Sequence, residues 1–127
     1  MPTTILIIED SRTQAIRLQL ELQRHGLAVE IAATGDTGLA AARQVRHQAI
    51  VLDVELPGID GYTICRTLKS DPATSAIPII MLTRHDETGD ALVGLRVGAD
   101  DYIPKDSFAE HNVVEALRQL GLIEGSV

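Results

Sequence analysis

The sequence predicts an α/β protein in which five parallel strands alternate with five helices. Five short runs of Ile, Leu and Val recur along the 127 residues, and stretches with an apolar residue at every third or fourth position separate them. The runs in the middle of the chain are almost entirely apolar, which is typical of a parallel sheet covered on both faces. Strict alternation over this length predicts a doubly wound sandwich, a single domain with helices on both faces of the sheet.

The predicted strands are short and rich in branched aliphatic residues, a composition that favours extended backbone. Pro78 stands just before the fourth of them, where its missing N–H does little harm. The five predicted strands are Ile5–Ile8, Val29–Ala32, Ala49–Leu52, Ile79–Leu82 and Asp101–Ile103.

Each predicted helix has one apolar face. In the first, Ala15, Leu18 and Leu22 fall on one side. We expect Ile16 and Leu20 to widen this apolar stripe. The third helix is predicted to have Gly61, Ile64, Cys65 and Leu68 on its inward side and to end at Asp71-Pro72. The remaining helices are predicted at Thr37–Val45, from about Glu87 to Val97, and around Val113, Val114, Leu117 and Leu120, which share one face.

The composition argues against several functions. The formal net charge is −7 and no cluster of Lys and Arg occurs, so direct binding to nucleic acid, which requires a basic face, is not expected. The N-terminal apolar run is too short for a membrane span or a signal-peptide core, and it lacks a positive leader. A lone cysteine, Cys65, excludes an internal disulfide and fits a reducing compartment. We therefore expect a cytoplasmic protein without membrane contact.

Chemically active side chains stand at the ends of four predicted strands. Glu9 and Asp10 follow the first strand, Asp53 ends the third, Thr83 ends the fourth, and Lys105 follows the fifth. The carboxyl ends of parallel strands meet at one edge of the sheet, where ligands bind in this class of fold. Carboxylates held together bind a cation, and Mg²⁺ suits a site with few protein ligands. An aspartate beside such an ion can act as a nucleophile toward phosphorus.

Each of these residues also has an ordinary structural explanation. Either Asp10 or Ser11 could be the N-cap of the first helix, and Asp53 could belong to a turn. Thr83 alone is more often structural, and Lys105 alone would be a solvated surface lysine. However, four different strands each end in a residue type that phosphoryl chemistry needs. This coincidence favours a common phosphoryl-transfer site over four separate structural explanations.

The chain resembles the receiver domain of two-component response regulators from Thr4 to about Leu120. This resemblance implies one receiver domain over residues 1–127 and a flavodoxin-like, five-stranded parallel sheet of order 2-1-3-4-5. It rests on the runs Ile7–Ser11, Val51–Gly61, Ile79–Thr83 and Gly98–Lys105.

The resemblance implies a role for each acidic residue. Asp53 matches the phosphoacceptor, and Glu9 and Asp10 match the family's acidic pair beside a bound Mg²⁺. The main-chain carbonyl of Glu55 would complete the metal ligands that the protein provides. Glu55 lies two positions past Asp53, and His85 lies two positions past Thr83. These two side chains would flank the path of attacking water and tune the lifetime of the phosphorylated state.

The resemblance also implies a switch. Thr83 and Tyr102 match the coupled switch pair, and Lys105 matches the lysine that pairs with the phosphoryl group. The family usually has proline directly after this lysine, often through a cis bond, whereas here Pro104 precedes it and Asp106 follows. A non-proline cis bond costs about 3 kcal/mol, so we expect the Lys105–Asp106 bond to be trans.

The predicted function is a phosphoacceptor switch, not an enzyme apart from its own phosphorylation and dephosphorylation. Its expected partners are a histidine kinase or phosphotransfer protein and a downstream target, or an output domain not in this chain. One alternative is a phosphohydrolase of the haloacid dehalogenase type, which would use Asp53 as nucleophile; Glu55 then stands where that family has its general acid. Another alternative is a receiver that only docks. The remaining histidines, His25, His47 and His111, are expected at the surface.

Overall fold

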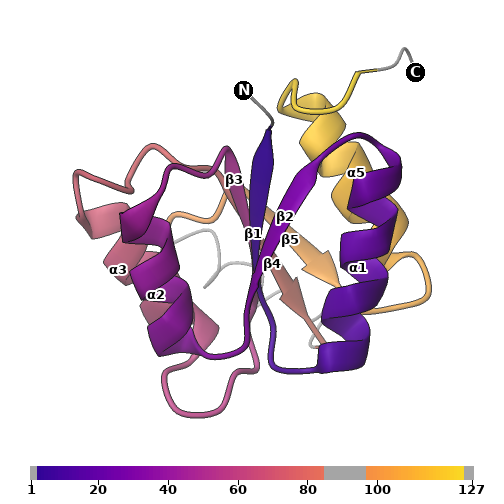
Figure 1. Ribbon diagram of the computed structural model, residues 1–127. Helices are drawn as coiled ribbons and strands as arrows, with labels where there is room; N and C mark the ends of the chain where they lie inside the picture. Colours follow the sequence, from indigo (N-terminus) through magenta and orange to yellow (C-terminus); the bar gives the residue numbers. More distant parts are fainter. Residues whose placement is uncertain (1–2, 85–96, 125–127) are drawn as a thin grey trace.

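The computed structural model describes residues 3–84 and 97–124. Five parallel strands form one sheet of order β2-β1-β3-β4-β5, as predicted. In Figure 1, α2 and α3 lie on one side of the sheet and α1 and α5 on the other. The elements are β1 (Thr4–Ile8), α1 (Arg12–Arg24), β2 (Ala28–Ala32), α2 (Gly35–Gln44), β3 (Ala49–Asp53), α3 (Gly61–Ser70), β4 (Ile79–Thr83), β5 (Asp101–Pro104) and α5 (Ala109–Gln119).

The strands bury both of their faces because successive side chains point to opposite sides of the sheet. Even a single strand contributes to two cores: Leu6 and Ile8 face α2 and α3, whereas Ile5 and Ile7 face α1 and α5. All four side chains are almost completely buried. The nearly continuous apolar runs in the sequence are therefore explained by a sheet that is covered on both sides.

Helix α1 has a narrower buried face than predicted. Ala15, Leu18 and Leu22 are buried, but Ile16 is 37% exposed and Leu20 is 57% exposed. At 100° per residue these two positions turn away from the inward row, so the expected widening of the apolar stripe is wrong.

The ends of the helices differ slightly from the prediction. Helix α2 begins two residues early because Thr34 caps it: its hydroxyl accepts a hydrogen bond from the Thr37 N–H at 3.1 Å. Helix α5 ends at Gln119, so Leu120 lies beyond the helix and is 39% exposed instead of inward. The helix expected from about Glu87 to Val97 falls mostly on residues 85–96, which lie outside the described residues.

Cys65 and His47 are buried although neither lies in a strand. Cys65 is fully buried in α3, as expected. His47 is only 1% exposed, so its predicted surface position is wrong. Its Nε2 lies 2.8 Å from the Glu30 carboxylate of β2, a partner distant in sequence that a reading of local pattern does not reveal. No helix within residues 3–84 and 97–124 is both long enough and apolar enough to cross a membrane.

Candidate functional site

The carboxyl ends of the strands bring the predicted acidic residues together. Asp53 is the last residue of β3 and Glu9 directly follows β1; their exposed fractions are 2% and 5%. Asp10 is exposed beside them. Each of the three offers a carboxylate oxygen, and these oxygens lie within 4.8 Å of one another. Hard oxygen donors at this spacing fit a divalent cation such as Mg²⁺, which binds through a few carboxylates.

The first turn of α1 leaves Asp10 available to this site. Ser11 is the N-cap, and its hydroxyl accepts a hydrogen bond from the Gln14 N–H at 3.3 Å. The Ser11 N–H in turn donates to the Glu9 carboxylate at 3.1 Å. Of the two capping alternatives, Ser11 is therefore the correct one, and the cap also helps to orient Glu9.

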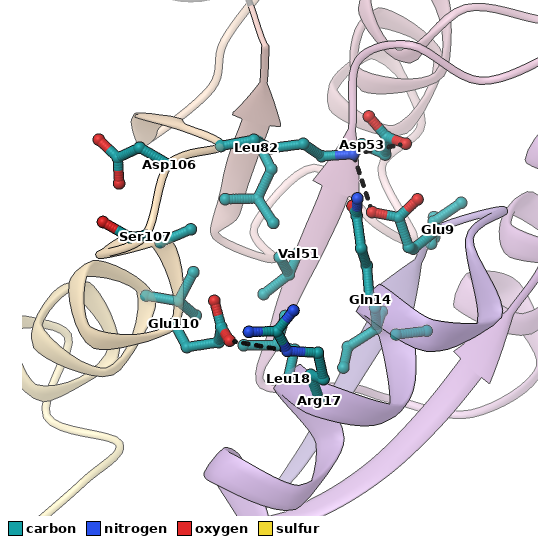
Figure 2. A pocket seen from close by; sticks show the side chains of 16 residues that line it. Glu9, Gln14, Arg17, Leu18, Val51, Asp53, Leu82, Asp106, Ser107 and Glu110 are labelled. Carbon is teal, nitrogen blue, oxygen red and sulfur yellow. Dashed lines mark ion pairs between the residues drawn. The ribbon is translucent and has the colours of Figure 1, made fainter.

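Lys105 reaches the acidic residues from the loop after β5. Its Nζ lies 2.9 Å from Glu9 Oε1 and 3.0 Å from Asp53 Oδ2. In Figure 2, Glu9 and Asp53 lie at the same end of the pocket, where a dashed line marks an ion pair. The Lys105 N–H also donates to the Thr83 carbonyl at 2.6 Å, which fixes this loop against β4. The Lys105–Asp106 peptide bond is trans, as expected.

Burial and neighbouring groups shift the pKa of Glu9 and of Lys105. Burial raises the pKa of Glu9 to about 7, and the neighbouring Asp53 acts in the same direction, although Lys105 and the Ser11 N–H oppose it. Burial alone would lower the pKa of Lys105, but its contacts with Glu9 and Asp53 outweigh burial and raise that pKa. The ammonium is therefore held in its charged form between two carboxylates.

The main chain around Asp53 is tightly enclosed. Asp53 Oδ1 accepts a hydrogen bond from the Glu55 N–H at 3.0 Å. Gly61, the first residue of α3, donates its N–H to the Val54 carbonyl at 3.0 Å. A Cβ at Gly61 would lie 2.5 Å from the Asp53 carbonyl oxygen and 2.6 Å from Val54 Cα, so only glycine fits. The start of α3 thus rests directly on the backbone of Asp53.

Thr83 and Glu55 form a contact that the sequence did not predict. Thr83 ends β4 and is fully buried. Its hydroxyl donates to Glu55 Oε2 at 3.0 Å, while the Arg84 N–H donates to Glu55 Oε1 at 2.6 Å. The side chain of Glu55 therefore extends from the loop after β3 to the end of β4.

Tyr102 also has an unpredicted neighbour. It pairs in register with Met81, two residues before Thr83, and packs against the core that α2 and α3 cover. Its hydroxyl lies 3.1 Å from that of Tyr62 in α3. Scarcity of aromatic residues was the one sequence signal that could have singled out Tyr62, because the chain contains two Tyr and one Phe.

A cavity of about 250 Å³ lies between α1 and α5, and Glu9, Asp53 and Lys105 contribute to its lining. Its floor is apolar, with Leu18, Val51 and Leu82 (Figure 2). At the end away from Asp53, Arg17 of α1 lies 3.7 Å from Glu110 of α5. His85, the remaining predicted site residue, lies outside the described residues.

Fold and site together define a class: a doubly wound sheet with an acidic cluster and a lysine at the carboxyl edge. The family model of the response regulator receiver domain matches residues 5–118. The chain therefore belongs to the response regulator receiver domain family, whose members are signalling switches of two-component systems.

Individual relatives agree with this assignment. The chain is 46% identical over 105 residues to the transcriptional regulatory protein AfsQ1 of Streptomyces coelicolor, covering 83% of this chain and 45% of AfsQ1. It is 41% identical over 101 residues to protein PilH of Pseudomonas aeruginosa, covering 80% of this chain and 84% of PilH. The chain thus spans less than half of AfsQ1 but most of PilH.

Solved structures share the fold. The chemotaxis response regulator CheY4 of Vibrio cholerae has a TM-score of 0.87 and 27% identity, covering 94% of this chain and 99% of CheY4. The receiver domain of the sensor histidine kinase PA1611 of Pseudomonas aeruginosa has a TM-score of 0.84 and 28% identity, covering 94% and 97%. In that structure a magnesium ion is coordinated in the active-site cleft.

Proposed function

We propose that this receiver domain accepts a phosphoryl group on Asp53. The observation that carries the proposal is the position of the Lys105 ammonium, 3.0 Å from Asp53 Oδ2 and 2.9 Å from Glu9 Oε1. An Asp53 oxygen attacks phosphorus, the bond from phosphorus to the leaving group of the donor breaks, and that group departs with its electron pair. Lys105 then pairs with the phosphoryl oxygens.

The same residues fit Mg²⁺. We propose that the side chains of Glu9, Asp10 and Asp53 and the main-chain carbonyl of Glu55 hold it. When bound, the ion supplies positive charge against the carboxylates and the phosphoryl oxygens. The oxygen-rich donor set and its spacing within 4.8 Å support this choice, and the magnesium-bound PA1611 receiver domain is consistent with it.

The phosphoryl donor would be a histidine kinase or a phosphotransfer protein in the cytoplasm. The surface changed by phosphorylation would be recognised by a downstream protein or by an output domain not in this chain. Thr83 and Tyr102 would carry the change from the site to the surface. The proposed tuning of the phosphoryl lifetime by Glu55 and His85 stays a prediction. We propose no other catalytic activity for the chain.

The geometry does not favour a dehalogenase-type phosphohydrolase. That mechanism requires a general acid two residues after the nucleophile, which is Glu55 here. Both carboxylate oxygens of Glu55 instead accept hydrogen bonds, from Thr83 and from the Arg84 N–H. A carboxylate held in this way is poorly placed to give a proton to a leaving group at Asp53.

Intact mass measurement tests the phosphoacceptor. Incubation with acetyl phosphate and Mg²⁺ should add one phosphoryl group to the wild type and none to Asp53→Asn. Asp60→Asn is the matched control, since Asp60 caps α3 outside the cluster and asparagine caps equally well. Equal labelling of Asp53→Asn and the wild type would overturn the assignment.

A further inference from the structure

We infer that the Glu55 side chain is an autoinhibitory clamp, which holds the hydroxyl of Thr83 away from the phosphoryl site and so opposes activation. This inference rests on the proposed function, because it assumes that Thr83 bonds the phosphoryl group on Asp53. It gives Glu55 a role in the switching equilibrium of the unmodified protein, separate from metal binding by its main chain.

Glu55 links the two residues concerned. Its N–H donates to Asp53 Oδ1 at 3.0 Å, and its Oε2 accepts from the Thr83 hydroxyl at 3.0 Å. A threonine hydroxyl has one proton to donate. While that proton is given to Glu55, it is not available to a phosphoryl oxygen.

The clamp is held from a second direction. The Arg84 N–H donates to Glu55 Oε1 at 2.6 Å, so the carboxylate is fixed in both position and orientation. A hydrogen bond from a buried hydroxyl to a carboxylate is stronger than one between neutral groups. Thr83 is fully buried, which further limits competition from water for its proton.

The backbone of Thr83 has little freedom, so the hydroxyl must change partners by rotation of the side chain or by a small local shift. Its carbonyl accepts from the Lys105 N–H at 2.6 Å, and β4 is a central strand between β3 and β5. Threonine has a few discrete χ1 rotamers. Two alternative acceptors, the Glu55 carboxylate and a phosphoryl oxygen, therefore define two discrete states of the switch.

Removing the clamp should shift the equilibrium toward the activated state. The probe is beryllofluoride with Mg²⁺, which mimics the phosphoryl group, and the measurement is its affinity by calorimetry. Glu55→Ala should bind it about tenfold more tightly than the wild type, because a hydrogen bond to a charged group no longer has to be broken. Glu55→Gln keeps a side-chain carbonyl that can accept from Thr83, but a neutral acceptor holds the hydroxyl more weakly than a carboxylate. Its gain in affinity should therefore be clearly smaller than that of Glu55→Ala.

A double-mutant cycle separates the clamp from simple charge repulsion. In a Thr83→Val background, Glu55→Ala should lose most of its effect on affinity, because no hydroxyl is left to release. An equal gain with and without the Thr83 hydroxyl would overturn the inference, and so would equal gains for Glu55→Ala and Glu55→Gln. Thermal unfolding checks that each variant folds, and Thr83→Ala replaces Thr83→Val if the latter does not.

The cycle also distinguishes failure of the clamp from failure of the proposed function. If the wild type binds no beryllofluoride with Mg²⁺, or Asp53→Asn binds it equally well, the phosphoacceptor assignment falls. If the wild type binds but Glu55→Ala leaves the affinity unchanged, only the clamp falls. In the free protein, Glu55→Ala should also shift the Arg84 amide resonance, which reports the loss of the contact itself.

Discussion

The hydroxyls of Tyr62 and Tyr102 lie 3.1 Å apart and join helix α3 to strand β5. Both rings pack against the core on the α2 and α3 side of the sheet, and Tyr102 lies on the strand beside the one that ends in Thr83. The residue proposed to transmit the switch is thus attached to a helix whose first residue rests on the Asp53 backbone.

Removal of either hydroxyl should weaken this attachment. Tyr62→Phe and Tyr102→Phe should each lower the free energy of unfolding by about 0.5–1.5 kcal/mol, the usual net contribution of one hydrogen bond. Urea denaturation of the two single variants and the double variant measures the coupling. Because both variants break the same contact, the double variant should cost less than the sum of the singles. Strict additivity would show that the contact contributes nothing to stability.

Lys105→Met should make the stability of the protein depend more strongly on Mg²⁺. Without the ammonium, the carboxylates of Glu9, Asp10 and Asp53 lose their neutralising partner, and a bound cation relieves more repulsion. Saturating Mg²⁺ should therefore raise the melting temperature more in Lys105→Met than in the wild type.

Lys69→Met is the matched control for that experiment. Lys69 donates to the Ile77 carbonyl at 2.8 Å and pairs with Asp100 at 3.2 Å, in a cluster separate from the acidic residues. Its loss should lower the melting temperature by the same amount with and without Mg²⁺. A wild-type-like Mg²⁺ response in Lys105→Met would show that Lys105 does not neutralise the site.

Asp10→Asn should weaken Mg²⁺ binding while leaving helix α1 intact. Asp10 is the exposed member of the cluster, and Ser11 rather than Asp10 caps the helix. Loss of one charged ligand should reduce the affinity for Mg²⁺ and slow phosphorylation by acetyl phosphate. Calorimetric titration measures the affinity, and circular dichroism checks the helix. Unchanged affinity would place the ion elsewhere.

The stability of the wild type should fall as the pH rises above about 9 because of Cys65. Burial raises the pKa of this thiol from 9.0 to about 11. Above pH 9 the unfolded chain releases the thiol proton while the folded chain retains it, so ionisation favours unfolding until the folded thiol also ionises. The loss is on the order of 3 kcal/mol, since one pKa unit corresponds to about 1.4 kcal/mol and the pKa of the thiol rises by about two units.

Cys65→Ser isolates this contribution, because serine can still donate to the Val97 carbonyl, which the thiol contacts at 3.5 Å. All other titratable groups are common to both proteins and cancel in the comparison. The difference between the two stability curves from denaturant unfolding should narrow between pH 9 and 11. A constant difference would mean that the thiol ionises equally in both states.

The sequence was sufficient to predict the acidic edge of the sheet but not the contacts behind it. Asp53, Glu9 and Lys105 could be placed together because parallel strands end at a common edge whatever their side chains do. The bond from Thr83 to Glu55 depends on a particular rotamer, which no periodicity reveals. The burial of His47 likewise depends on Glu30, a partner in another strand.

The prediction of a wide buried face on α1 was wrong for a different reason. The pattern showed which side of the helix faces inward, but it gave no measure of how much of the helix the sheet and α5 cover. Ile16 and Leu20 are apolar and still face solvent. Single exposed apolar side chains are common on folded proteins, so hydrophobicity alone does not settle burial.

Gly61 fits closely against the backbone of Asp53 and Val54, so we expect the start of α3 and the end of β3 to move together. A Cβ at Gly61 would lie only 2.5 Å from the Asp53 carbonyl oxygen, so the backbone at the start of the helix lies directly against the backbone at the end of the strand. A protein that binds the outer face of α3 and shifts this helix would therefore also shift the backbone of Asp53, the proposed phosphoacceptor. By thermodynamic reciprocity, a docking partner that prefers one position of α3 would change the energetics of phosphorylation, and phosphorylation would change the affinity of that partner to the same degree.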